Sequence, residues 1–267
     1  MTDASAQAGG PRPEGARSAE PALGPTLAAL LEVDFTVQLR NYRSALLSLV
    51  LPLVVLIALS TNKRAVALGD PRIRVSLVML LGMATIAILG YSLNVAQDRE
   101  AGVFQRLRVT PAPAWAIMGS RLVVQVALIL LMAILVFVVA RIALNVTLDP
   151  LAYVLTLAVV IAGSAVFLAI GQALVGLIRS ANTLNAVSRL VYIPLFGLGL
   201  LGQTDILGST IENIARWSPG GIVGTLLLAA MQQATWGSDA WWSLLACLGY
   251  TAVFVFLGIR WFQWGTH

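Results

Sequence analysis

Residues 97–121, QDREAGVFQRLRVTPAPAWAIMGSR, form the most charged segment between the long apolar runs of this chain. The signs alternate along its first half, where apolar residues such as Val103 and Leu107 lie between the charges. This pattern predicts an amphipathic helix with an apolar edge that could fit a groove in a partner. Pro111 and Pro113 then stop the helix. An ordinary solvated loop with basic anchors is the alternative.

The rest of the chain has the composition of a membrane protein. It has 267 residues, of which 58% are hydrophobic and only 11% are charged, whereas soluble domains have about 25% charged residues. We therefore expect an all-α, polytopic membrane protein. The net charge of +5 comes from one Lys and sixteen Arg at the ends of apolar runs, so no nucleic-acid surface is indicated.

Six apolar runs are expected to be transmembrane helices. They cover residues of about 44–60, 75–97, 119–140, 151–178, 185–203 and 240–260, with a polar loop at 61–74. The uncharged segment 217–238 has an apolar part too short to cross as a helix. We expect it to be a re-entrant helical hairpin before the sixth span, in which Gly220 and Gly224 allow close helix packing. A seventh span is the alternative.

The N-terminal part is expected to lie outside the membrane core. Residues 1–26 are rich in Ala, Gly, Pro and charge, which predicts a disordered cytoplasmic tail. Residues 27–43 have imperfect helical spacing and two arginines at the membrane boundary, so they predict an amphipathic interfacial helix or, alternatively, a soluble cap to the first span. With the N-terminus inside, eleven basic residues lie inside and six outside, so both termini are expected in the cytoplasm.

The sequence contains no motif for a nucleotide-binding or catalytic site that could supply energy. A P-loop needs a lysine after a glycine run, but the only lysine, Lys63, follows no such run. The single histidine is the last residue, His267, and the single cysteine, Cys247, lies in an apolar run. We therefore expect no metal, no cofactor and no catalytic site, and the chain is not expected to be an enzyme. Energy must come from a partner, for which residues 97–111 are the expected docking point.

Polar side chains inside the spans are few. Asn94, Gln125 and Gln172 could line a cargo route, or they could form interhelical hydrogen bonds that hold the helices together. No carboxylate falls inside a span, which argues against proton-coupled transport.

Residues 98–111, DREAGVFQRLRVTP, resemble the signature of type-2 ABC exporter permeases, in which an acidic residue, a glycine, Arg-Leu and Thr-Pro precede the third span. The resemblance covers roughly residues 27–262, the expected transmembrane domain. It implies two permease copies, paired through spans one and five as a homodimer, and two copies of a separate ATPase subunit that binds ATP and Mg. It also implies a cytoplasmic coupling helix that contacts the ATPase and contains Asp98, Arg99, Glu100, Gly102, Phe104, Arg106 and Arg108. The hairpin before the sixth span is implied to close the outer face, with Pro219, Gly220 and Gly224 as a candidate outer gate.

The chain is more similar to the drug-exporter branch of this family, which includes daunorubicin-resistance permeases, than to the polysaccharide branch. Aromatic residues make up only 7% of the chain, and most tryptophans fall where interfacial belts are expected. The resemblance implies ATP-driven export of a hydrophobic small molecule (a drug or antibiotic) or a lipid across a bacterial inner or plasma membrane. The alternative is a non-transport membrane scaffold or assembly protein that binds a soluble partner through residues 97–111.

Overall fold

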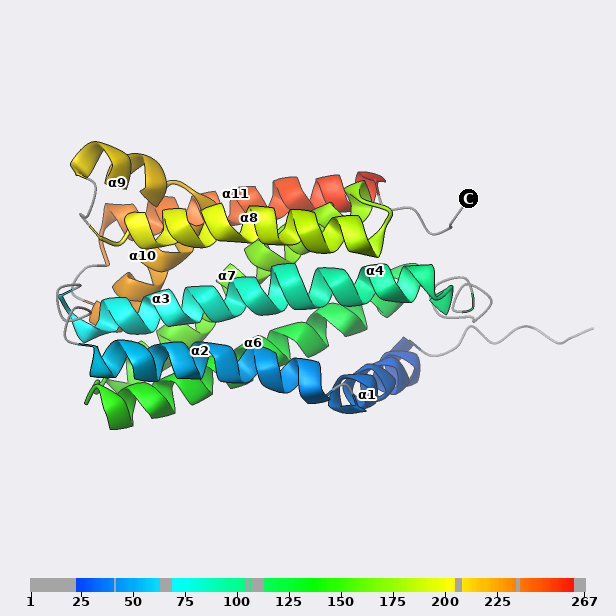
Figure 1. The fold of residues 1–267 in the computed structure, drawn as a ribbon, viewed down its shortest axis with the longest axis horizontal. Helices are drawn as coiled ribbons and strands as arrows, with labels where there is room; N and C mark the ends of the chain where they lie inside the picture. Colours follow the sequence, from blue (N-terminus) through cyan, green and yellow to red (C-terminus); the bar gives the residue numbers. More distant parts are fainter. Residues whose placement is uncertain are drawn as a thin grey trace, which may run out of the picture.

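The computed structural model describes residues 23–40, 42–62, 69–103, 106, 113–204, 208–233 and 236–261. Every regular element within these residues is a helix, as predicted (Figure 1). In chain order they are α1 (Leu23–Arg40), α2 (Tyr42–Thr61), α3 (Pro71–Ala84), the π-helix η2 (Thr85–Tyr91), α4 (Ser92–Glu100), α6 (Ala114–Ala143), α7 (Pro150–Leu177), α8 (Ala181–Leu201), α9 (Ser209–Arg216), α10 (Pro219–Gln232) and α11 (Ser238–Trp261).

Five helical segments are long and apolar enough to cross a membrane: Pro71–Glu100, Trp115–Ala143, Pro150–Leu177, Ala181–Leu201 and Ser238–Trp261. They overlap five of the six expected spans. A sixth candidate is the pair α9–α10, which is bent by 90°. The expected first span, 44–60, lies in α2, whose apolar part Leu46–Thr61 is shorter than the other five. The described residues therefore contain five or six candidate spans.

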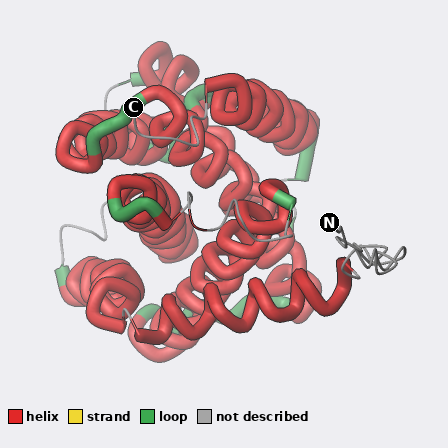
Figure 2. The backbone as a smooth tube through the Cα atoms, turned by 90° about the vertical axis from the view of Figure 1, so that its right-hand side faces the viewer, coloured by secondary structure: helices red, strands yellow, loops and turns green. Residues whose placement is uncertain are grey.

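The long helices run lengthwise between two ends of the molecule (Figure 1). One end, called here the α1 end, holds α1, the end of α4 and the turn between α7 and α8. The other end, called the α9 end, holds α9, α10 and the beginnings of α3 and α11. Figure 2 looks along the bundle from the α1 end, and α1 lies across that end.

The centre of the bundle is formed by the segment α3–η2–α4 together with α7. Of the most apolar part of each span, 72% is buried in Pro71–Glu100 and 61% in Pro150–Leu177, but only 17% in Ala181–Leu201 and 17% in Ser238–Trp261. Because the last two helices are as apolar as a membrane span requires, α8 and α11 present apolar surface outward.

The central segment is interrupted by the π-helix η2, which packs closely on α7. A Cβ atom at Gly171 of α7 would come within 2.6 Å of the Ala87 carbonyl oxygen, so the two helices approach more closely than any larger residue allows. At the start of η2, the Thr85 hydroxyl donates a hydrogen bond to the Leu81 carbonyl oxygen at 2.7 Å. Wider π turns inside α-helices often occur at functional sites.

The polar loop expected at 61–74 is shorter than predicted. Helix α3 begins at Pro71, and the Asp70 carboxylate caps it by accepting a hydrogen bond from the Arg72 backbone N–H at 2.8 Å. An acidic cap followed by proline in the first turn is a standard helix start. The four residues from Pro71 to Arg74 are therefore helical, and the prediction of a loop there is wrong.

Candidate functional site

Helix α4 ends inside the charged segment, at Glu100. The Ala101 backbone N–H donates to the Gln97 carbonyl at 2.9 Å, and the Gly102 N–H donates to the Arg99 carbonyl at 3.1 Å. Gly102 has a φ of 70°, the left-handed conformation with which glycine commonly ends a helix. Gly102 therefore bends the chain inside the expected helix of residues 97–108, of which the structure describes 97–103 and 106.

Beyond this turn, Val103 is helical, and the Arg106 N–H donates to the Gly102 carbonyl at 3.3 Å. The Arg106 side chain is exposed. Phe104 and Arg108, which were also assigned to the coupling segment, lie outside the described residues.

Arg99 does not point into solvent but caps another helix. Its guanidinium donates to the carbonyl oxygens of Val175 at 2.8 Å, Ile178 at 2.6 Å and Arg179 at 2.8 Å, and the residue is only 5% exposed. Val175 lies in the last turn of α7, Ile178 is its C-cap, and Arg179 follows in the turn to α8. The last carbonyls of a helix have no intrahelical partners. A cation at this position is also favoured by the helix dipole.

Glu100 binds α8, the helix that follows the turn after α7. Its carboxylate accepts a hydrogen bond at 2.7 Å from the backbone N–H of Ala181, the first residue of α8. An anion at a helix N-terminus is favoured by the dipole and by the unpaired N–H groups there. Arg99 and Glu100 thus attach the end of α4 to both sides of the α7–α8 turn, an arrangement called here the Arg99–Glu100 clamp.

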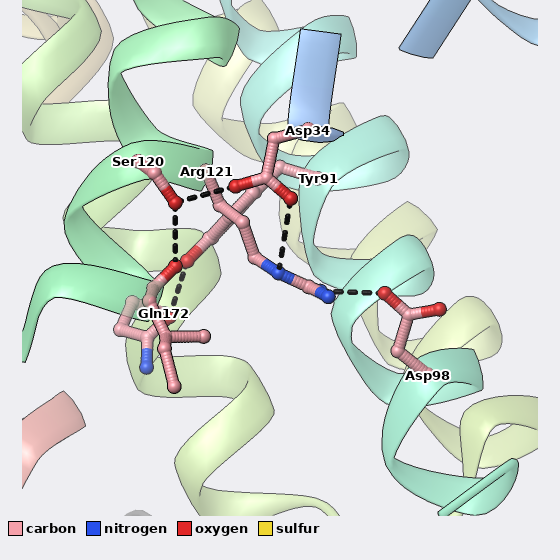
Figure 3. Close-up of polar contacts among 7 residues, drawn as sticks. Asp34, Tyr91, Asp98, Ser120, Arg121 and Gln172 are labelled. Carbon is pink, nitrogen blue, oxygen red and sulfur yellow. Dashed lines mark hydrogen bonds and ion pairs between the residues drawn. The ribbon is translucent and has the colours of Figure 1, made fainter. Parts of the chain in front are cut away.

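Asp98 faces a different neighbour (Figure 3). It accepts a hydrogen bond from Arg121 Nη1 of α6 at 2.5 Å, and Arg121 Nε lies 4.0 Å from Asp34 Oδ1 of α1. The Ser120 hydroxyl donates to the other Asp34 oxygen at 2.5 Å. This network joins α1, α4 and α6 at the α1 end.

The environment of Asp34 changes its acidity. Burial raises the pKa of this carboxyl above its ordinary value, and the nearby Asp98 adds to the increase. The hydrogen bond from Ser120 and the charge of Arg121 lower the Asp34 pKa, but they do not cancel the effect of burial. Asp34 therefore carries its negative charge at a cost in free energy.

An open cavity of about 360 Å³ lies beside this network, between α1, the η2–α4 segment and α6. Two of the three predicted cargo-route residues, Asn94 and Gln125, line it. The third, Gln172 of α7, accepts a hydrogen bond at 2.7 Å from the hydroxyl of Tyr91, which lines the same cavity (Figure 3). The structure thus brings these three residues together around η2.

The candidate outer-gate residues lie at the α9 end, apart from this cavity. Pro219 opens α10 after the cap residue Ser218, whose hydroxyl accepts a hydrogen bond from the Gly221 N–H at 3.0 Å. Gly220 packs against the backbone of α8, where a Cβ atom would meet Gly199 at 3.2 Å, and Gly224 packs against the Gln203 side chain. Gly220 and Gly224 thus allow α10 to pack closely on α8 and on Gln203, which follows it.

Several residues of the α1 end were not assigned a role from sequence. Asp34, Ser120 and Arg121 form the polar network, and the backbone of residues 178–181 binds the clamp. A signal for Asp34 was present, because it continues the helical spacing of Leu27, Leu30 and Leu31. Spacing of that kind places it on the face that meets the rest of the protein.

Within the described residues, the chain is all-helical and has five or six candidate membrane spans. Among the residues described, no group of three or more His, Cys, Asp or Glu side chains could hold a metal ion. The chain belongs to the ABC-2 type transporter family, whose model matches residues 26–232. It is also similar to a protein of Bacillus subtilis strain 168 named "Putative transport permease YvfS", with 24% identity over 184 residues, covering 67% of this chain and 74% of that protein.

Family membership establishes the general function of the chain. The chain is a multi-pass membrane protein and the permease subunit of a membrane transporter. Membership of an ABC transporter family also implies an ATPase partner.

Proposed function

We propose that this chain is the permease subunit of an ATP-driven exporter that moves a hydrophobic small molecule, such as a drug or antibiotic, or a lipid out of the cell. A separate ATPase chain supplies the energy and docks on residues 97–111 at the α1 end. The observation that carries the proposal is the Arg99–Glu100 clamp. It connects this docking segment, which lies between α4 and α6 in the chain, to α7 and α8.

The clamp supplies a physical route for force. A displacement of the docking segment acts on α4 directly, and through α4 on the buried central segment Pro71–Glu100. The ion pair between Asp98 and Arg121 passes it to α6. The bonds of Arg99 and Glu100 pass it to the end of α7 and the start of α8. One docking event therefore reaches four spans.

The proposed assembly has two permease copies and two ATPase subunits, which bind ATP and Mg, in a bacterial inner or plasma membrane. The α1 end faces the cytoplasm, and both termini of the chain are proposed to be cytoplasmic. The balance of basic residues, eleven inside against six outside, supports this orientation. The outward apolar surfaces of α8 and α11, each only 17% buried in its most apolar part, are available to lipid and to the second copy.

Reconstitution with its ATPase subunit tests the proposal. The purified pair should hydrolyse ATP, and vesicles containing it should accumulate a fluorescent hydrophobic cargo only when ATP is present. Glu100→Ala should reduce ATP-dependent transport by about tenfold or more, since coupling energies are commonly 1–3 kcal/mol. The matched control is Glu212→Ala, which removes a carboxylate of α9 at the opposite end and should leave transport near the unmodified level.

Two results would contradict the proposal. If Glu100→Ala transports as well as Glu212→Ala, the clamp does not couple the ATPase to the spans. If the chain binds a soluble partner through residues 97–111 but no ATPase associates with it, the scaffold function expected as the alternative replaces export.

A further inference from the structure

Two amide groups that line the cavity at the α1 end have no hydrogen-bond partner among the described residues. Gln125 is only 7% exposed and lines the cavity, yet it makes no hydrogen bond to any described residue. Asn94 lines the same cavity, is half-buried and also lacks such a bond. Neither amide is sealed inside the protein, because both side chains line the open cavity, so both can bind a molecule that enters it.

The charges of the cavity favour a cationic occupant. Two carboxylates, Asp34 and Asp98, line it together with one cation, Arg121. Arg121 is already paired with both, and its side chain is 15% exposed, whereas the Asp98 side chain is 38% exposed. The most accessible charge is therefore negative. An anionic group entering the cavity would lie beside two carboxylates, while a cation would be attracted to them.

An apolar cavity adjoins the polar one. It measures about 450 Å³, lies between α1, α2 and α6, and shares the residues Gln38 and Val124 with the first. Its other lining residues are all apolar: Phe35, Leu39, Leu46, Leu49, Ala127, Leu128 and Leu131. A polar, negatively charged compartment thus continues into an apolar one, and each has a volume typical of small-molecule sites.

We propose that the two cavities together form one binding site for a cationic amphiphile. Its amine or ammonium head lies in the first cavity, between Asp34, Asp98 and the amides of Asn94 and Gln125. Its hydrocarbon part lies in the second, against α1, α2 and α6. This inference rests on the proposed function, since it names the chemical class of the cargo that the permease moves.

Ligand binding to the full-length chain in lipid nanodiscs, without the ATPase, tests this site. The probe is radiolabelled dodecyltrimethylammonium, and dodecyl sulfate is the anionic probe with the same tail. Binding to empty nanodiscs is subtracted. The cationic probe should bind at least tenfold more tightly than the anionic one, because only its head has the opposite charge to the cavity.

Charge substitutions make the test specific to the cavity. Gln125→Glu should tighten binding of the cationic probe by roughly tenfold, and Gln125→Lys should weaken it by a similar factor. Because a buried charge at Gln125 could disturb folding, Asn94→Asp and Asn94→Lys provide a second pair at a half-buried position. Glu32→Gln is the matched control, since Glu32 is an exposed carboxylate on α1 that does not line either cavity.

The proposal is overturned if the two probes bind equally, if neither binds, or if both pairs of charge substitutions leave affinity unchanged. It is likewise overturned if Glu32→Gln alters binding as much as the cavity variants do. Because no ATPase is present, this result is independent of the export assay. Specific binding of the cation without ATP-dependent transport would leave the site in place and refute export instead.

Discussion

Asp98, Arg99 and Glu100 follow one another in the chain, yet each binds a different helix. Asp98 pairs with α6, Arg99 caps α7 and Glu100 caps the start of α8. The family resemblance implies that these residues couple the chain to an ATPase. No residue pattern predicts which groups of this chain they bind. Arg99 binds backbone carbonyls 76 to 80 residues away, and backbone atoms are the same in every residue, so no residue pattern marks them.

The clamp predicts that lysine cannot replace Arg99 without a loss of stability. Arg99→Lys should lower the free energy of unfolding by about 1–3 kcal/mol, because a single ammonium cannot reproduce the planar fork that reaches three carbonyls. Unfolding can be followed with a thiol-reactive dye, since the only cysteine, Cys247, is 1% exposed when folded. The control is Arg179→Lys, the same change at an exposed side chain beside the clamp. Equal loss in both variants would show that the fork is not used.

At the scale of elements, the helical class and the five long spans follow from length and hydropathy, which dominate wherever a segment must cross a membrane. The ends of the helices were predicted less accurately from the sequence. Helix α3 starts earlier than expected because a capping aspartate and a proline favour helix at Asp70 and Pro71. The π-helix η2 was not predicted at all, since its residues read as one apolar run with the neighbouring α-helices.

The close approach of η2 and α7 gives a test at this scale. Gly171→Ala should lower the free energy of unfolding by about 1–3 kcal/mol, because its Cβ atom would lie 2.6 Å from the Ala87 carbonyl and force the helices apart. Gly249→Ala in α11 is the control: nothing lies within 4 Å of its Cβ position, so it should be neutral or stabilising. Thermal unfolding in detergent measures both. A stability loss at Gly249 equal to that at Gly171 would exclude a packing effect.

At the scale of the whole molecule, the network of Asp34, Arg121 and Asp98 and the clamp both lie at the α1 end, whereas the glycine contacts of α10 lie at the α9 end. Chain order places residues 97–121 and the α7–α8 turn at the same end of an up-and-down bundle. The sequence could therefore predict which segments share an end, but not which side chains meet there, because that depends on the rotation of each helix about its axis.

Labelling in intact cells tests the proposed orientation. In a Cys247→Ala background, a single cysteine is placed at exposed Asn213 of α9 or at exposed Arg106. A membrane-impermeant maleimide should label Asn213→Cys in intact cells and Arg106→Cys only after the cells are permeabilised. The reverse pattern would place the α1 end outside, where an ATPase supplied with cellular ATP could not dock.

The π-helix also determines how the two halves of the central segment are rotated relative to each other. Each residue of an α-helix turns the chain by about 100°, and the wider turns of η2, residues Thr85–Tyr91, rotate it less per residue. The direction in which the side chains of Arg99 and Glu100 point therefore depends on the total rotation of the chain about the helix axis between Pro71 and the end of α4. Loss of one residue between 85 and 91 would leave every apolar side chain in an apolar run, yet it would turn the end of α4 away from α7 and α8. Chain length in η2 is thus under a stricter constraint than residue type.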